Sequence, residues 1–439
     1  MKNIFKSLIN KKGAKNVLSI LSGNSAGYLI SICAIPVLTR LYNPEQIGHL
    51  SLFMSIILVL SVGICLKYEL AIVLPKNKKD AMALLYASFF FAFIISIIIE
   101  IAVLFTGPYI SLWINKPVIR SLMLFIPVGL FLNGIYQSLS YWTLRMKRFN
   151  YIGISWAIII GFAVITQIFI GLTLKPSVLG LITGYISGLF AGSLFLLLWS
   201  LKKDTFYINW ADLIKTAIVQ VKKYKKYPLY SVWPSFLDNF TMTMPILFFT
   251  RFFDQAVVGL YSLGMKTLMA PVSVLGKPIS QVYFQRVADE LNSKNEVTTI
   301  VEDTFLALFF ISLPILLIIP IAPQFFSTVF GDKWLETGYF VRILAPAMIF
   351  RFIASPMSVV FGALNKQEIS AIWKVLAFFA TAISLLLSIP FKDPMVTVIF
   401  LTINDIIIYN VYILMIFKVS KVRFYEMIKR VPQLWHNWL

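Results

Sequence analysis

Long apolar runs recur from one end of the chain to the other, and this feature restricts the fold more than any other. Each run is about 20 residues long, the length that a helix needs to cross the hydrocarbon core of a bilayer. A backbone inside lipid must satisfy its own hydrogen bonds, so each run is predicted to be a transmembrane α-helix. Only 13% of the residues are charged, about half the share typical of soluble domains. The sequence therefore excludes a soluble globular protein.

Twelve such runs are predicted, six on each side of a basic interval. The expected fold class is an all-α membrane protein with about 12 transmembrane helices in two six-helix lobes around a central cavity. The lobes are residues 1–201 and 229–439, and residues 202–228 form a cytoplasmic amphipathic linker between them. The predicted spans are Val17–Leu38, Ile47–Leu74, Met82–Phe105, Ile119–Leu144, Ile152–Leu174, Val178–Leu201, Tyr230–Phe249, Val257–Ile279, Phe305–Phe326, Tyr339–Ala363, Ile369–Ile389 and Met395–Phe417.

Lysine and arginine are distributed unevenly between the two sets of loops. With the N-terminus in the cytoplasm, the cytoplasmic loops and tails carry 26 of these residues and the opposite loops carry 8. Cytoplasmic loops carry the excess of positive charge in membrane proteins, so both termini are predicted to be cytoplasmic. The net charge of +20 is thus explained by orientation and by contact with anionic membrane lipids, and nucleic acid is not expected as a partner.

The linker contains an amphipathic segment, Asn209–Lys226. Its apolar residues recur at helical spacing and lysines fill the other positions, so it is predicted to be a helix on the cytoplasmic headgroups. An ordinary basic linker is the alternative. A second cytoplasmic excursion, Gln281–Asp303, is expected to extend the eighth helix beyond the membrane.

A short sequence repeats after the first and seventh spans. Residues 39–52 read TRLYNPEQIGHLSL and residues 250–263 read TRFFDQAVVGLYSL, with Thr, Arg, Gly, Ser and Leu shared at a constant offset of 211. A proline precedes each copy, at Pro36 and Pro245. Duplication of a six-span unit explains the match and gives two halves of the same orientation. Two such halves leave a cleft between them that can open to either side, as in alternating access.

Several segments together resemble a known family. They are residues 36–48 (PVLTRLYNPEQIG), 67–75 (KYELAIVLP), 224–228 (YKKYP), 258–261 (VGLY) with Pro271 downstream, and 329–334 (VFGDKW). In this order they are similar to the bacterial polysaccharide flippases of the Wzx type. Those proteins belong to the multidrug/oligosaccharidyl-lipid/polysaccharide exporter superfamily.

The resemblance implies a fold, a substrate and partners. It implies two six-helix bundles with spans 1, 2, 7 and 8 facing a central cavity. The implied substrate is undecaprenyl pyrophosphate carrying an oligosaccharide, moved from the cytoplasmic to the outer leaflet of the bacterial inner membrane. The implied pathways are O-antigen, lipopolysaccharide or capsule biosynthesis, with a polysaccharide polymerase and a chain-length regulator as partners.

Eight of the charged residues inside the predicted spans are candidates for a role within the membrane. A charge at the bilayer centre costs about 3 kcal/mol on insertion scales, so such residues usually face a partner or a wet cavity. Four lie near the middle of their spans, and four lie nearer an end, where long side chains can reach the headgroups. The first four are Asp238, Lys266, Arg351 and Asp405, and the others are Lys67, Glu69, Glu100 and Lys374.

Cations suit the substrate that the resemblance implies, because a pyrophosphate must exchange its hydration for Lys or Arg contacts. Lys67 and Lys266 are the first candidates to bind it; a local ion pair or snorkelling is the alternative for both. Arg40 and Arg251 occupy matched positions of the repeat and are candidates to receive the pyrophosphate on the outer side. Capping of helix C-termini is their alternative role.

Carboxylates are the candidates for coupling transport to H+ or Na+. Asp238 lies mid-span beside Asn239, and a protonation or sodium site there fits as well as an ion pair with Lys266. Glu69 is the second candidate. Arg351 and Asp405 are predicted to form a structural pair within the second lobe.

Other function classes lack the motifs that they need. Gly276-Lys277 is followed by Pro278, so no Walker A loop is formed. No polar segment holds paired carboxylates or a Ser/His arrangement, and no enzyme activity, metal or cofactor is expected. Cys33 and Cys65 lie in apolar runs, which argues against a disulfide. Two alternatives stay open: a drug/cation antiporter of the same superfamily, and a membrane glycan polymerase or ligase, which would need a larger external loop.

Overall fold

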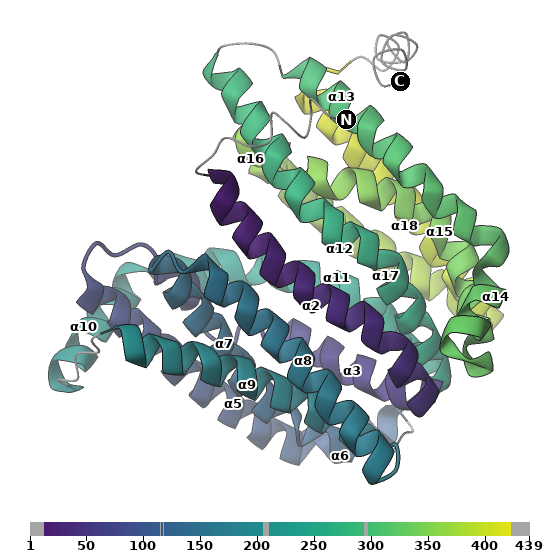
Figure 1. The fold of residues 1–439 in the computed structure, drawn as a ribbon, viewed down its shortest axis with the longest axis horizontal. Coiled ribbons are helices and arrows are strands. Elements are labelled where there is room, and N and C mark those ends of the chain that lie inside the picture. The colour runs from purple at the N-terminus through teal and green to yellow at the C-terminus, as the bar shows by residue number, and fades with distance from the viewer. Residues whose placement is uncertain (1–12, 115, 117, 205–209, 294–296, 423–439) are drawn as a thin grey trace. The chain divides into compact units, whose positions relative to one another are not determined.

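The computed structural model describes residues 13–114, 116, 118–204, 210–293 and 297–422. Over these ranges every regular element is a helix, which confirms the all-α class (Figure 1). The helices are α2 (Gly13–Leu41), α3 (Pro44–Leu60), α4 (Tyr68–Ala71), α5 (Lys78–Ile114), α6 (Val118–Met123), α7 (Ile126–Arg145), α8 (Phe149–Thr173), α9 (Val178–Lys203), α10 (Trp210–Lys223), α11 (Lys226–Phe252), α12 (Gln255–Asn292), α13 (Thr298–Ser312), α14 (Ile318–Phe330), α15 (Leu335–Met357), α16 (Val360–Ala363), α17 (Gln367–Ser388) and α18 (Pro394–Val419), with 3₁₀ turns at Leu313–Leu317, Asp332–Trp334 and Ile389–Phe391.

The helices have the length and surface of membrane spans. Nine helical stretches of the described chain are long and apolar enough to cross a bilayer, and α2 and α3 contain two shorter apolar segments. Together with α11 they account for the predicted spans. On α5, Phe105, Tyr109 and Leu112 are each more than 70% exposed, which suits lipid and not water. The chain is a multi-pass membrane protein.

The fourth and ninth predicted spans are each interrupted near a proline. The fourth span consists of α6 and α7, and the ninth consists of α13 and α14 with a 3₁₀ turn between them. Pro127 lies in the first turn of α7, and Pro314 lies at the start of the 3₁₀ turn. Proline lacks a backbone N–H and is tolerated at the start of a helix but not in its interior, so Pro127 favours the start of α7 and Pro314 favours the end of α13.

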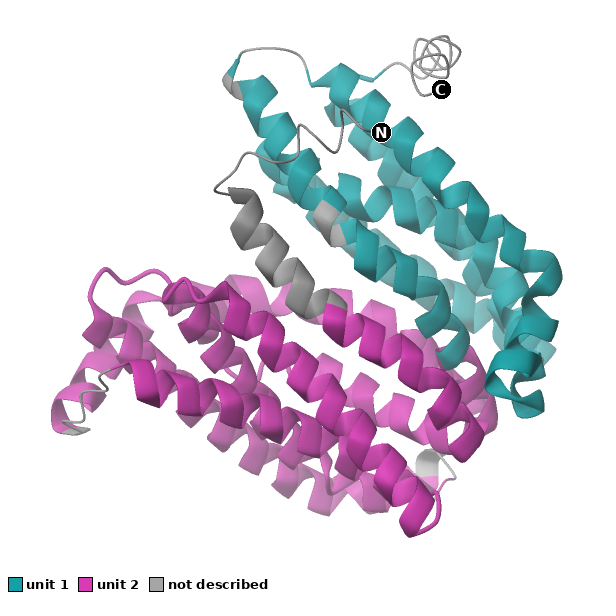
Figure 2. Ribbon diagram, in the orientation of Figure 1, with its two compact units in different colours: residues 1–14, 263–439 teal, residues 15–262 magenta. Residues whose placement is uncertain are grey.

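Contacts divide the chain into two compact units (Figure 2). Unit 1 comprises residues 263–439 with residues 1–14, and its core lies among α13, α15 and α18, around Phe352, Phe361 and Ile416. Unit 2 comprises residues 15–262, with one apolar cluster around Phe53 and another around Trp142. These units describe how segments pack, and the division into six-helix lobes at residues 202–228 stays a prediction.

Three glycines on one face of α9 allow close packing against α8. Gly184, Gly188 and Gly192 recur every four residues, a spacing that places them on one helix face. A Cβ atom at Gly188 would lie 2.4 Å from the Ile159 carbonyl oxygen, and one at Gly192 would lie 2.3 Å from Ile159 Cγ1. Small residues at such an interface let two helices in a membrane approach closely, and this packing holds α8 and α9 together within unit 2.

The amphipathic segment of the linker is a helix, α10, but its apolar residues serve two surfaces. Leu213 is 5% exposed and packs toward α5, whereas Ile214 and Ile218 are more than half exposed. Lys79 of α5 forms an ion pair of 3.4 Å with Asp212. The predicted helix is therefore present and one side of it is held by the protein, while its position on the cytoplasmic headgroups stays a prediction. The predicted extension of the eighth helix is confirmed by α12, which continues to Asn292.

The repeated sequences adopt the same local structure. The first copy contains the end of α2 at Leu41 and the start of α3 at Pro44, and the second contains the end of α11 at Phe252 and the start of α12 at Gln255. Both pairs of bounds differ by 211 residues, the offset of the sequence match. In both copies the serine after the glycine bonds back to the carbonyl four residues earlier. The structure supports the predicted duplication.

Candidate functional site

The second predicted span, Ile47–Leu74, is not a continuous helix. Helix α3 ends at Leu60, residues 61–67 form a series of turns, and α4 begins at Tyr68. Much of the turn backbone is satisfied locally, since the N–H groups of residues 62–64, 66 and 68 bond to carbonyls three residues back. The prediction of one long helix was wrong here, because an apolar run gives no sign of a break whose hydrogen bonds are made locally. Non-helical backbone at membrane depth is tolerated where protein or water surrounds it.

Lys67 lies at the end of these turns in an uncommon conformation. Leu66 and Lys67 have φ values of 50° and 60°, in the left-handed region that bulky residues rarely adopt. Such strain persists only where surrounding contacts enforce it, and it concentrates at functional sites. The break therefore marks the segment around Lys67 as a candidate site.

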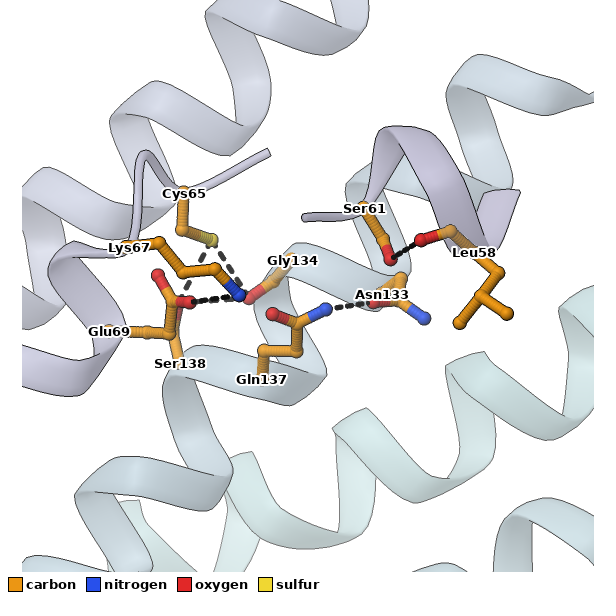
Figure 3. Close-up of polar contacts among 9 residues, drawn as sticks. All are labelled: Leu58, Ser61, Cys65, Lys67, Glu69, Asn133, Gly134, Gln137 and Ser138. Carbon is orange, nitrogen blue, oxygen red and sulfur yellow. Dashed lines mark hydrogen bonds and ion pairs between the residues drawn. The ribbon is translucent and has the colours of Figure 1, made fainter. Parts of the chain in front are cut away.

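The side chains of Lys67 and Glu69 lie next to each other where the turns end and α4 begins (Figure 3). Lys67 Nζ lies 3.9 Å from Glu69 Oε1, and the two side chains are 16% and 2% exposed. The structure thus brings together one predicted substrate-binding cation and one predicted coupling carboxylate. A distance of 3.9 Å is longer than a direct hydrogen bond, so the pair leaves Lys67 with donor capacity for another anion.

Glu69 is only partly satisfied by the protein. Its Oε2 atom is buried and has no hydrogen-bond partner among the residues that the structure describes. Leaving such a group unpaired costs about 1–3 kcal/mol, and more for a charged one. A proton or a cation at Glu69 would remove this cost.

Helix α7 presents polar groups to the broken segment. Asn133 and Gln137 lie one turn apart, and the Gln137 amide donates a hydrogen bond to Asn133 Oδ1 (Figure 3). Cys65 Sγ lies 3.4 Å from Ser138 Oγ and 3.5 Å from the Gly134 carbonyl oxygen. A Cβ at Gly134 would lie 3.3 Å from the same sulfur, so the glycine allows the turns to approach α7.

Two contacts fix the chain on either side of Glu69. The Tyr68 hydroxyl donates to the Val221 carbonyl at 3.2 Å, which ties the broken segment to α10. The Arg145 guanidinium donates to carbonyls of the segment that follows α4, including those of Ile72 and Val73. These bonds satisfy carbonyl groups that a continuing helix would otherwise have used. They hold the site without occupying Lys67 or Glu69.

The remaining candidates lie on other helices. Arg40 and Arg251 occupy the last turns of α2 and α11, as capping predicts, and Arg251 also lies 5.5 Å from the Phe252 ring centroid. Asp238 is half-buried in α11 of unit 2, whereas Lys266 is exposed on α12 within unit 1. The pairing of Asp238 with Lys266 stays a prediction.

The structural pair predicted in the second lobe is confirmed within unit 1. Arg351 Nη1 lies 3.9 Å from Asp405 Oδ2, and both side chains are mostly buried. The Arg351 guanidinium also lies 5.5 Å from the Tyr409 ring centroid, a cation–π distance. These contacts give Arg351 and Asp405 a role in joining α15 to α18.

Sequence reasoning missed an acidic centre at the end of α9. The buried Asp204 carboxylate accepts two hydrogen bonds from Arg148, at 2.8 and 3.0 Å, and one from Trp142 Nε1 at 3.0 Å. An aspartate directly after Lys202 and Lys203 resembles an ordinary linker residue, so no local signal distinguishes it. Asn133 and Gln137 were also missed, although two amides four residues apart in an apolar run do give such a signal.

Comparison with known sequences places the chain among proteins of polysaccharide synthesis. A family model described as "Polysaccharide biosynthesis protein" matches residues 37–338, more than half of the chain. An uncharacterized membrane protein in the cps region of Klebsiella pneumoniae is 26% identical over 159 residues, which cover 36% of this chain and 32% of that protein. The teichuronic acid biosynthesis protein TuaB of Bacillus subtilis (strain 168) is 26% identical over 129 residues, covering 28% and 26%. The matches thus span about a third or less of these relatives.

Solved structures share the fold over nearly the whole chain. The lipid II flippase MurJ in an inward closed conformation has a TM-score of 0.72 at 13% identity, covering 95% of this chain and 89% of that one. An inward-facing multidrug resistance transporter of the MATE family, in the MOP superfamily, has a TM-score of 0.69 at 16% identity, covering 90% and 94%. At these identities the similarity establishes the fold alone.

Proposed function

This chain belongs to the family of polysaccharide biosynthesis proteins, and from that premise we propose that it is a flippase for lipid-linked oligosaccharides. The substrate is undecaprenyl pyrophosphate bearing an oligosaccharide repeat unit. The protein carries it by alternating access from the cytoplasmic to the outer leaflet of the bacterial inner membrane, with both chain termini in the cytoplasm. A polymerase and a chain-length regulator then use the exported unit for O-antigen or capsule synthesis.

The buried Lys67–Glu69 pair supports this function most directly. A pyrophosphate can enter a membrane protein only if cations replace its hydration. Lys67 lies where the backbone re-enters a helix, and its Nζ is 3.9 Å from its only carboxylate partner among the described residues. The side chain of Lys67 is therefore partly accessible and loosely held, which are properties that a transient phosphate contact requires.

Exchange of partners at this pair also explains how transport can be coupled to protons. When the pyrophosphate takes Lys67 as its counter-ion, Glu69 loses its cation. A carboxylate that is 2% exposed and lacks a partner for Oε2 then favours the neutral, protonated form. One proton on Glu69 then offsets one of the two negative charges of the pyrophosphate diester, and Lys67 offsets the other. Release of the substrate returns Lys67 to Glu69 and frees the proton on the same side of the membrane as the substrate.

Deletion of the gene tests the proposed function in the cell. We expect surface polysaccharide to disappear and intact lipid-pyrophosphate-linked repeat units to accumulate on the cytoplasmic face. Both should return when the wild-type gene is supplied on a plasmid. Unchanged surface glycan without trapped units would contradict the proposal. A gain of drug sensitivity in its place would favour the drug/cation antiporter.

A further inference from the structure

The two copies of the repeat contact each other through their glycines. Gly48 lies in the first turns of α3 and Gly259 in the first turns of α12. A Cβ built on Gly48 would lie 2.0 Å from the Gln255 carbonyl oxygen, and one built on Gly259 would lie 1.9 Å from the Pro44 carbonyl oxygen. No larger residue fits at either position without moving the backbone. All these residues belong to unit 2.

The contact is reciprocal, as in an interface around a two-fold axis. Gly48 and Gly259 are matched by the repeat offset of 211, and so are Pro44 and Gln255. Each glycine meets the helix start of the other copy, and each built Cβ would lie 3.0 or 3.1 Å from the other glycine's nitrogen. Self-complementary contact of this kind is what a symmetry axis imposes. We call this contact the glycine crossing.

Lys116 forms hydrogen bonds with the second copy of the repeat, next to the glycine crossing. Its ammonium donates to the carbonyl oxygens of Thr250 at 3.0 Å and Phe253 at 2.8 Å, and to Gln255 Oε1 at 3.2 Å. The three donors of the lysine are thereby used at the C-terminus of α11, where a cation is favoured. Burial lowers the pKa of Lys116, and the carboxylate of Asp254 opposes that shift.

The first copy is held differently, by neutral groups. The Tyr42 hydroxyl donates to the Gln167 carbonyl at 2.7 Å, and the Gln46 amide donates to the Pro176 carbonyl at 2.8 Å. The two acceptors lie in α8 and in the turn after it, so these bonds join the first copy to the packed helices α8 and α9. The second copy is held in part by the ammonium of Lys116 and by the glycine crossing.

We propose that the glycine crossing is the outer gate of the transport route and that Lys116 is the residue that positions it closed. The proposal rests on the proposed function, since a flippase must seal its outer side while the inner side is open. Charge bias places this end of the helices outside. Two helices that meet backbone to backbone can part without withdrawing interlocked side chains. Helix α12 continues from the crossing into unit 1 at Leu263, so movement of that unit acts directly on the gate.

Cysteine labelling tests the gate without any glycan substrate. The native Cys33 and Cys65 are first replaced by Ala and Ser. Thr39 and Thr250, matched residues that are 2% and 1% exposed, then each become a single reporter as Thr39→Cys or Thr250→Cys. Intact cells are treated with a membrane-impermeant maleimide. In the otherwise unchanged protein, labelling at both reporters should be slow, because the closed gate covers them.

A methyl group at the crossing should hold the gate open. Gly48→Ala or Gly259→Ala should raise the labelling rate at both reporters by about tenfold, the population shift expected from overpacking of 1–3 kcal/mol. Gly161→Ala is the matched control, because nothing lies within 4 Å of a Cβ built there; its labelling should stay at the parent rate. The amount of protein in the membrane and its melting temperature are measured for every variant.

Two results would overturn the gate. The first is an unchanged labelling rate in folded Gly48→Ala and Gly259→Ala protein, which would make the crossing static packing. The second is a Gly161→Ala control that is labelled as fast as the two crossing variants, which would mean that any added methyl group loosens the protein. If both alanine variants fail to accumulate, expression at a lower temperature and the Lys116→Met variant, which adds no atom to the crossing, serve the same comparison. An unchanged labelling rate in folded Lys116→Met protein would then also count as static packing. Failure of the proposed function is seen separately, in the gene-deletion assay.

Discussion

The two copies of the repeat begin alike and then diverge. Both place a helix end, a two-residue turn and a glycine at matched positions, and both use them at one crossing. Beyond that point α12 continues as one helix to Asn292, whereas α3 stops at Leu60. Lys67 and Glu69 follow the break after α3, and the positions 211 residues later are Pro278 and Ser280 in α12.

This difference separates two tasks that one duplicated sequence performs. Symmetry persists where both copies must meet, because each copy is the other's contact surface. Symmetry is lost at Lys67 and Glu69, where the proposed function needs only one Lys–Glu pair to bind an anion together with a proton. We therefore place the chemistry of transport in the first copy and the closure of the outer side in both.

The largest expected effect is on the flipping rate, and it comes from removing the positive charge of Lys67. Lys67→Gln should reduce flipping by about 100-fold, the loss of a charge-assisted contact worth about 3 kcal/mol. It also leaves Glu69 uncompensated, so thermal stability should fall. The double variant Lys67→Gln with Glu69→Gln should recover the melting temperature, because it buries no lone charge, but not the transport.

Lys67→Arg is the control for that experiment, since it keeps the charge. It should retain more transport than Lys67→Gln. Full transport by the double variant would show that the pair only stabilises the broken helix, and the assignment of substrate binding to Lys67 would then be wrong.

Removal of the hydrogen bonds that Lys116 makes to the second copy should have a smaller effect. Lys116→Met removes three hydrogen bonds from a charged donor and should cost about 2 kcal/mol of stability. Tyr42→Phe removes one bond of the first copy and should cost about 1 kcal/mol. Only Lys116→Met should speed labelling at Thr250→Cys. Equal labelling in the two variants would mean that the copies are fastened alike.

The smallest effect concerns backbone strain. Leu66 packs against the cluster around Trp142, so Leu66→Gly is compared with Leu66→Ala, which loses nearly the same packing. Leu66→Gly should be about 1 kcal/mol more stable than Leu66→Ala, because glycine adopts a positive φ without cost. The matched position in the other copy is Lys277, within continuous α12, where Lys277→Gly should be about 1 kcal/mol less stable than Lys277→Ala. Thermal unfolding in detergent measures all four variants. The same order of glycine and alanine at both positions would contradict a strained break that only the first copy has.

The sequence predicted the architecture because lipid leaves little choice. Apolar runs of the right length, charge bias and the repeat offset were enough for the helical class, the spans and the matched turns. Residue pairs such as Arg351–Asp405 were also predictable, since buried opposite charges tend to meet. The break at residues 61–67 was not, because its hydrogen bonds lie within the turns and its left-handed residues are Leu and Lys, which carry no turn signal. The positions of Lys116 and Asp204 depend on tertiary contacts across 134 and 56 residues.

Flipping by the purified protein in liposomes tests the central claim most directly. The probe is a short-chain polyprenyl pyrophosphate that bears a labelled oligosaccharide, loaded in both leaflets, and an impermeant glycosidase reports the fraction outside. Wild-type protein should make nearly all of the probe accessible, with Lys67→Gln close to empty liposomes. Wild-type protein that leaves half of the probe protected, as empty liposomes do, would contradict the account.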